Sequence, residues 1–163
     1  SIVSLLAGIA YPAIFAAKRK AESAVARQTV AGIAVDIARY EMETGRYPGV
    51  SWKDGENAFP ALIDGEVDGG KRTCPLARIP HEGWIVASAD GEFRRPSQEE
   101  IGDRKVPKYL ADPWGRPYVY RENRSRPARP YMEHPGAFDL YSTGPDREDG
   151  RLRRRPGDDI GNW

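Results

Sequence analysis

The chain has 163 residues and a formal net charge of +1, so it lacks the strong overall charge that favours nucleic acid or acidic substrates. Charged residues make up 30% of the chain and the mean hydropathy is −0.66. The single cysteine, Cys74, excludes a disulfide within the chain. This length predicts one domain in addition to any extended helix.

The first 45 residues predict one long helix with two environments. Ser1–Ala17 carries no charge, and its 17 residues approach the roughly 20 apolar residues that cross a membrane. We therefore expect this segment to lie in lipid or in the core of a helical bundle. Pro12 should kink or locally melt the helix, because proline lacks the amide hydrogen that the helix needs. The apolar run starts abruptly at Ser1, so we expect further residues before it in the complete protein.

The second part of this helix, from Lys18 to Gly45, is amphipathic. Its apolar residues recur at helical spacing and form one stripe, made of Val30, Ile33, Ala34, Ile37 and Tyr40. Gly45, with Pro48 shortly after it, is a typical helix end. We expect the stripe to pack against the remainder of the chain.

Three basic residues, Lys18, Arg19 and Lys20, close the apolar run. By the positive-inside rule alone they would lie in the cytoplasm. A placement of the head on the opposite side of the membrane would conflict with this rule.

The remaining residues, 46–163, predict a small head with short strands. Strands are expected at 84–88, 118–120 and 137–142, with an Asp-Gly turn at 89–91. A short helix is expected within 52–64 and a loop at 65–83, whereas 96–106 fits either a loop or a short helix. The predicted fold class is α+β, with a long N-terminal helical stem (1–45) packed on a small antiparallel sheet of the head (46–163).

Acidic residues gather in the last part of the chain. Asp146 and the adjacent pair Asp158-Asp159 supply three carboxylates if the intervening loop folds back. Calcium takes six to eight oxygen ligands, and a divalent ion relieves the repulsion between neighbouring carboxylates. The spacing does not match an EF-hand, so from these residues alone a solvated acidic turn remains the stronger alternative.

Four motifs in chain order resemble the major pseudopilin of type II secretion systems, within the wider type IV pilin-like family. An apolar helix with an internal proline at Pro12 also fits the stem of that family. Residues 49–111 carry little of the resemblance. The motifs are Gly45-Arg46-Tyr47-Pro48, Asp112-Pro113-Trp114-Gly115 with Pro117-Tyr118, Phe138–Ser142 with Gly144 and Asp146, and Asp159-Ile160-Gly161-Asn162-Trp163.

The resemblance implies a structural calcium ion in the last loop. The matching positions are the side chains of Asp146, Asp158 and Asp159, with the Thr143 carbonyl and Ser142 as further ligands. This chain departs from the family in the loop 147–157, which is longer and holds many arginines. The family's processing site and its glutamate near the mature N-terminus are also absent from this sequence.

The resemblance further implies a non-enzymatic subunit of a helical filament in the periplasm. Stems of many copies, including Leu5, Gly8, Ile9 and Pro12, would form the filament core, and growth would push folded cargo outward. The partners implied are other copies of the chain, minor pseudopilins and an inner-membrane secretion platform. Before assembly the stem would cross the inner membrane once. An adhesive or motility pilin, or a minor pseudopilin, is the alternative.

Two other function classes have weaker support in the sequence. Candidate catalytic residues are His81-Glu82, His134 and Cys74, but no H-E-x-x-H, G-x-S-x-G or C-x-x-C pattern accompanies them. The arginines at 121–129 and 151–155 could suggest nucleic acid. We expect them instead to form a solvated face balanced by nearby acidic residues, with no nucleic-acid partner.

Overall fold

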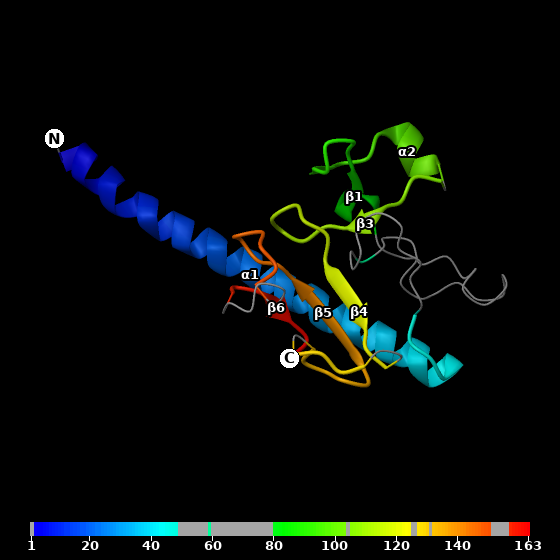
Figure 1. Ribbon diagram of the computed structural model, residues 1–163. Helices are drawn as coiled ribbons and strands as arrows, with labels where there is room; N and C mark the ends of the chain where they lie inside the picture. The colour runs from blue at the N-terminus through cyan, green and yellow to red at the C-terminus, as the bar shows by residue number, and fades with distance from the viewer. Residues whose placement is uncertain are drawn as a thin grey trace.

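A computed structural model of the chain describes residues 2–48, 59, 80–103, 105–124, 127–130, 132–150 and 157–163, with side chains from residue 14 onward. One long helix, α1, runs along the molecule, and the described strands form two small antiparallel sheets beside it (Figure 1). The predicted α+β class is confirmed. The predicted boundary between stem and head at residues 45 and 46 stays a prediction.

Helix α1 spans Ile2–Thr44. It ends where the sequence predicts, because Gly45 adopts a φ of 73° and its amide donates to the Glu41 carbonyl at 2.7 Å. The helix continues through Pro12 without interruption, so local melting, one of the two expected effects, is wrong, and a kink stays a prediction. Among the described residues, no helix has both the length and the apolar character that a membrane crossing requires. The membrane expectation for Ser1–Ala17 stays a prediction.

The larger of the two sheets packs against α1. This sheet contains β4 (Val119–Glu122), β5 (Phe138–Ser142) and β6 (Ile160–Gly161), with β5 in the middle. Both pairs are antiparallel, and Tyr120 pairs with Leu140 while Tyr141 pairs with Gly161. The predicted strands at 118–120 and 137–142 are therefore confirmed, although each begins one residue later. All five residues of β5 are buried, which makes this strand the centre of the head.

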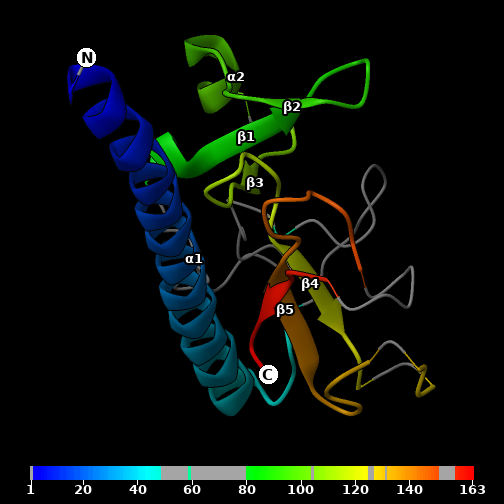
Figure 2. The same ribbon diagram turned by 90° about the vertical axis from the view of Figure 1, so that its left-hand side faces the viewer.

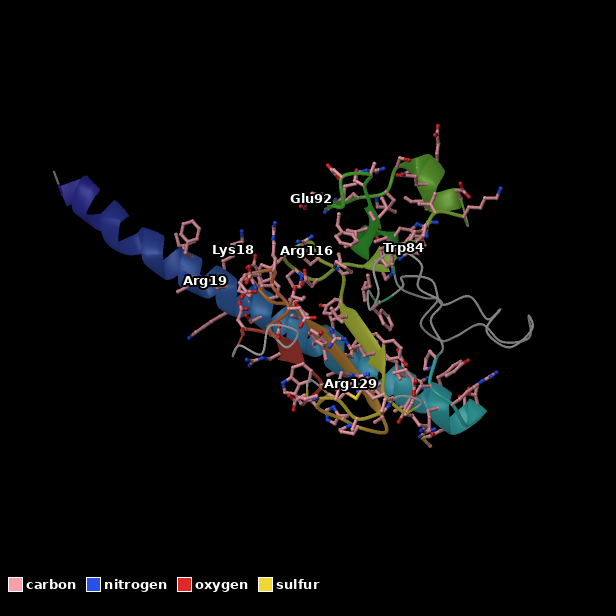
Figure 3. All side chains as sticks on the ribbon, in the orientation of Figure 1. Lys18, Arg19, Trp84, Glu92, Arg116 and Arg129 are labelled. Atoms are coloured by element: carbon pink, nitrogen blue, oxygen red, sulfur yellow. The ribbon has the colours of Figure 1, made fainter. Side chains whose placement is uncertain are left out.

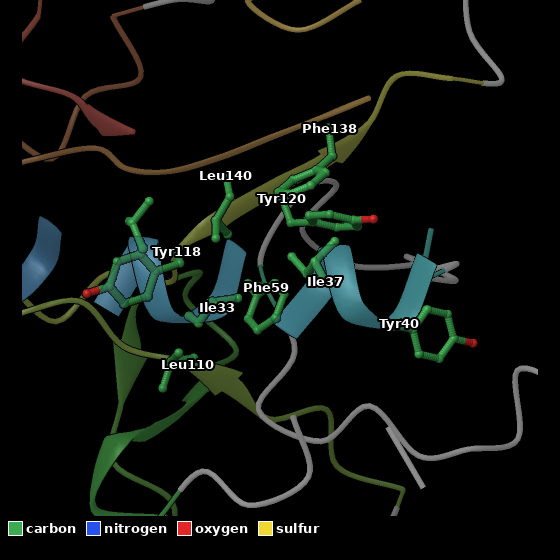
Figure 4. Close-up of a cluster of buried hydrophobic side chains, with 10 residues drawn as sticks. Ile33, Ile37, Tyr40, Phe59, Leu110, Tyr118, Tyr120, Phe138 and Leu140 are labelled. Atoms are coloured by element: carbon green, nitrogen blue, oxygen red, sulfur yellow. The ribbon is translucent and has the colours of Figure 1, made fainter. Parts of the chain in front are cut away.

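The predicted stripe of α1 forms the helical side of the hydrophobic core. Val30, Ile33, Ile37 and Tyr40 are buried, and Ala34 is partly buried against them. Figure 4 shows Ile33 and Ile37 next to aromatic and aliphatic side chains of the head. The strand and loop side of the core consists of Phe59, Leu110, Tyr118, Tyr120, Phe138 and Leu140. Helix and sheet thus share one core, as the spacing predicts.

A second, smaller sheet lies nearer the N-terminal half of α1 (Figure 2). It contains β1 (Trp84–Ala87), β2 (Phe93–Arg94) and β3 (Tyr109–Leu110), with β1 in the middle. A 3₁₀ helix, η3 (His81–Gly83), precedes β1 within the expected loop. The predicted strand and the turn at 89–91 are confirmed, with Gly91 at a φ of 83°. The helix expected within 52–64 lies outside the described residues, apart from Phe59.

The segment at 96–106, which the sequence left open, contains helix α2 (Gln98–Gly102). Ser97 starts this helix with a capping box, because its hydroxyl accepts from the Glu100 amide at 3.2 Å and the Glu100 carboxylate accepts from the Ser97 amide at 2.8 Å. Arg94 binds the same carboxylate at 2.7 Å, which connects α2 to β2.

Candidate functional site

The first candidate surface is the part of α1 that the head does not cover. Figure 1 shows the N-terminal part of the helix projecting beyond all described strands. Ile14 is 66% exposed and Phe15 49% exposed, so large apolar side chains face outward here. Figure 3 places Lys18 and Arg19 directly after them, where the helix leaves the head. Neighbouring exposed apolar side chains are typical of a surface that binds a partner.

The predicted stem residues lie on this projecting helix. Leu5, Gly8, Ile9 and Pro12 all fall within α1. Their side chains lie outside the part of the chain that the structure describes. Their roles in a filament core therefore stay predictions.

The second candidate site is the loop that leaves β5. Asp146 lies on its surface and accepts from the Glu148 amide through Oδ1 at 2.8 Å. The Arg147 amide donates to the Gly144 carbonyl at 3.2 Å, and Arg147 itself has a φ of 61°. These contacts close a tight turn that carries the first predicted calcium ligand.

The chain returns to this turn at its C-terminal end. A Cβ at position 144 would lie 2.6 Å from the Asp158 carbonyl oxygen. The backbone of Gly144 therefore lies closer to Asp158 than any residue with a side chain could. Burial, together with the nearby charge of Asp146, raises the pKa of Asp158. Two of the three predicted carboxylates therefore lie close enough to interact.

A buried link connects the turn to the Asp-Pro-Trp-Gly motif. The Ser142 hydroxyl donates to Asp112 Oδ2 at 2.6 Å and accepts from the Gly144 amide at 3.1 Å. Asp112 Oδ1 accepts from the amides of Trp114 and Arg116 at 3.0 and 2.9 Å. Burial raises the pKa of Asp112, while these hydrogen bonds oppose the shift. The Ser142 side chain is thus engaged in the protein's own hydrogen bonds.

A third acidic residue of the loop faces the sheet. Asp149 Oδ2 accepts from Arg121 Nη2 at 2.8 Å and from the Tyr141 hydroxyl at 2.7 Å. The Arg121 guanidinium also lies 5.4 Å from the centre of the Tyr141 ring. Burial raises the pKa of Tyr141, so this hydroxyl remains a donor. These contacts fix the far end of the turn to β4 and β5.

The terminal motif lies along the edge of β5. The Asn162 amide nitrogen and side chain exchange hydrogen bonds with Leu140 and Phe138, at 3.0 to 3.2 Å. Trp163 packs 5.6 Å from the Tyr141 ring and covers Gly161, where any side chain would overlap the indole. Trp163 therefore packs on the sheet, although the residue stays 47% exposed.

The fit of a calcium ion depends on the oxygen atoms that this loop offers. Within the described ranges, no three His, Cys, Asp or Glu side chains lie together as a metal site requires. Thr143 Oγ1, however, is buried, with no hydrogen-bond partner in the described part of the protein. Residues 151–156, between the predicted ligands, lie outside that part. A buried oxygen without a partner, on the same segment as Asp146, is the kind of ligand that a hard cation prefers.

The remaining sequence candidates take other contacts. His81 packs on Trp84 with ring centres 4.3 Å apart, and His134 Nδ1 lies 3.3 Å from the buried Asp139. Glu82 is exposed beside His81, and Cys74 is not among the described residues.

The expected solvated arginine face is wrong for Arg121, which is 5% exposed and paired with Asp149. It holds for Arg124, whose exposed guanidinium binds Glu41 at 2.9 Å. Arg129 is also exposed (Figure 3). Residues 151–155 lie outside the described ranges.

Comparisons with known proteins agree with the motifs. A family model described as type II secretion system protein G matches residues 93–163. This chain is similar to type II secretion protein G. It is 25% identical over 162 residues to the type II secretion system core protein G of Pseudomonas aeruginosa strain PAO1, covering 99% of this chain and 85% of that protein. No solved structure matches the chain.

The sequence did not reveal three functional contacts of this region. It did not pair Ser142 with Asp112, did not identify Asp149 as a fastening residue, and assigned no role to Asn162. Asp112, Ser142 and Asn162 each belong to a motif that the sequence analysis identified. Their membership of these motifs could have indicated that they lie close together. Asp149 lies in the loop that departs from the family, and nothing in its neighbours marks it.

Proposed function

We propose that this protein is a structural subunit of the periplasmic pseudopilus that drives type II protein secretion. The observation that carries the proposal is the combination of a projecting apolar helix with a head whose last 71 residues, 93–163, match the protein G model. The similarity to the Pseudomonas aeruginosa core protein G over 99% of this chain supports the same assignment. No catalytic step is assigned to the chain.

The geometry suits assembly by stacking of stems. Ile14 and Phe15 are exposed on α1 and do not pack in the core of their own head. A surface on one copy that binds a different surface on the next copy propagates into a helix instead of closing into a ring. Filament growth by this route would move the heads outward in steps, which is the motion that a secretion piston requires.

The location and partners follow from this function as further proposals. The stem would lie in the inner membrane before assembly, with the head in the periplasm. The subunit would then join other copies, minor pseudopilins at the tip and the inner-membrane platform at the base.

A secretion experiment tests the proposed function. Deleting the gene in the native host should retain type II cargo inside the cell, and the wild-type gene should restore release. Phe15→Asp places a charge on the exposed stem and should fail to restore it, because a buried charge in a stem contact is costly. Met42→Asp is the matched control, since Met42 is 82% exposed at the other end of α1. Normal secretion by the deletion strain would refute the proposal.

We also propose that the C-terminal loop holds a structural calcium ion. Asp146, Asp158 and Asp159 would supply carboxylates, and Thr143 would supply oxygen, with Ser142 contributing through its backbone carbonyl, because its hydroxyl is engaged. The ion would neutralise the adjacent carboxylates and secure a loop with few apolar residues. Binding would then contribute directly to folding.

Calcium removal tests this part of the proposal. At calcium 100-fold above its Kd, binding stabilises the folded state by about 2.7 kcal/mol, so chelation should lower Tm by several degrees. Asp159→Ala in the presence of calcium should behave like the chelated wild type. An unchanged Tm on chelation would rule out the structural ion.

A further inference from the structure

We propose that Asp149 is a positioning residue, which fastens the loop to the sheet and holds Asp146 beside Asp158 before any cation binds. The contact of Asp149 with Arg121 and Tyr141 is called the loop latch here. The inference deepens the proposed calcium site and rests on it. Its consequence is that the turn from Ser142 to Asp149 keeps its position on the sheet when calcium is removed.

The latch is built on two buried side chains of the larger sheet of the head. Tyr141 is fully buried in the central strand β5, and Arg121 is 5% exposed on the neighbouring strand β4. Both direct their donors to the same atom, Asp149 Oδ2, at 2.7 and 2.8 Å. A carboxylate that receives two such bonds, one of them from a cation, is held in one place.

The charge of Arg121 gives the latch its strength. A buried guanidinium that loses its counter-ion is strongly disfavoured, because it has given up water without gaining a partner. Asp149 Oδ2 lies 2.8 Å from Arg121 Nη2. Movement of Asp149 away from the sheet would break that ion pair, so the buried arginine favours the observed position of the turn.

The turn is fastened at both ends. At its start, the Gly144 amide donates to Ser142 Oγ at 3.1 Å, and Ser142 is in turn held by Asp112. At its far end stands Asp149. Asp146 lies between these two points and is therefore confined to a small region next to Asp158.

This confinement opposes an electrostatic cost. When Asp146 and Asp158 are both ionised and no cation is bound, the like charges repel each other, which favours separation of the turn from the C-terminal segment. The latch resists that separation through the contacts of Asp149, which involve neither Asp146 nor Asp158. The cation then meets ligands that are already placed, which reduces the ordering cost of binding.

The test uses the full chain, kept in detergent as a monomer, with three variants. Asp149→Asn removes the latch charge but keeps the side-chain shape. Tyr141→Phe removes only one donor and keeps the ion pair. Glu99→Gln removes the same unit of charge from an exposed position on α2 and serves as the control.

The first readout is hydrogen exchange of the Arg147 and Glu148 amides in calcium-free protein. Both amides donate within the turn, so they report its closure. We expect exchange to be at least about 10-fold faster in Asp149→Asn than in the wild type, and unchanged in Glu99→Gln. The second readout is calcium affinity by titration calorimetry. Loss of a residue that orients ligands typically weakens metal binding about 10- to 100-fold, and we expect this for Asp149→Asn.

Three outcomes would overturn the inference. Wild-type exchange and affinity in a folded Asp149→Asn variant would show that the latch positions nothing. If that variant does not fold, Tyr141→Phe decides, and unchanged exchange and affinity there would be equally contrary. A wild-type protein that binds no calcium would remove the ligand set that Asp149 is said to position. The secretion test of the proposed function is independent of all three.

Discussion

Gly144 has a conformation and an environment that together exclude a side chain. Its φ is 72°, and a Cβ there would lie 2.6 Å from the Asp158 carbonyl oxygen. We predict that Gly144→Ala costs about 1–2 kcal/mol from the left-handed conformation and a further 1–3 kcal/mol from the close contact. Chemical denaturation of the variant measures the loss.

Gly136 provides a matched control for this prediction. It has a φ of 83°, but nothing lies within 4 Å of the position that a Cβ would take. Gly136→Ala should therefore show only the conformational part of the cost. Equal losses in the two variants would mean that Gly144 and Asp158 are not in close contact in solution.

Individual polar partners were the least predictable feature of the site. The sequence indicated Asp146 and Asp158 as neighbours because the resemblance to the pseudopilin family implied that both bind one ion. It could not pair Arg121 with Asp149, because an ion pair between residues 28 positions apart depends on strand register and loop path. An arginine in a charged segment is usually expected to be solvated, whereas Arg121 is buried.

Helix α1 carries two kinds of surface along its length, and substitutions should separate them. Ile37 is fully buried in the core, whereas Val35, two residues before it, is 63% exposed. We predict that Ile37→Ala lowers the free energy of unfolding by about 2–5 kcal/mol. Val35→Ala should change it by no more than about 0.5 kcal/mol. Urea denaturation of the detergent-solubilised monomer measures both, and similar losses would contradict the observed orientation of the helix.

Long, regular elements were predictable, and very short ones were not. Apolar spacing over several residues predicts the helical stripe and the strands around Trp84, Tyr120 and Leu140. The glycine at Gly45 predicts the end of the helix. Strands β2, β3 and β6 have two residues each, which is too few to show an alternating pattern. Strand β6 forms because Asn162 and Trp163 fasten the chain end to β5, and that is a tertiary effect.

At the scale of the whole molecule, a packed head is joined to a projecting helix that carries exposed apolar residues (Figure 1). The described part of the head is held together by the core that it shares with α1 and by the contacts of Asp149 with the sheet. The projecting part of α1 presents exposed apolar residues next to a basic segment. A packed head joined to a helix with exposed apolar residues suits the proposed subunit of a growing filament.

The most direct measurement is electron microscopy of periplasmic fibres isolated from the native host, with antibody labelling of this chain. The account predicts label along the full length of the fibres, because the protein would be their repeating subunit. Recovery of the protein only as a monomer, or label confined to the fibre ends, would contradict that role.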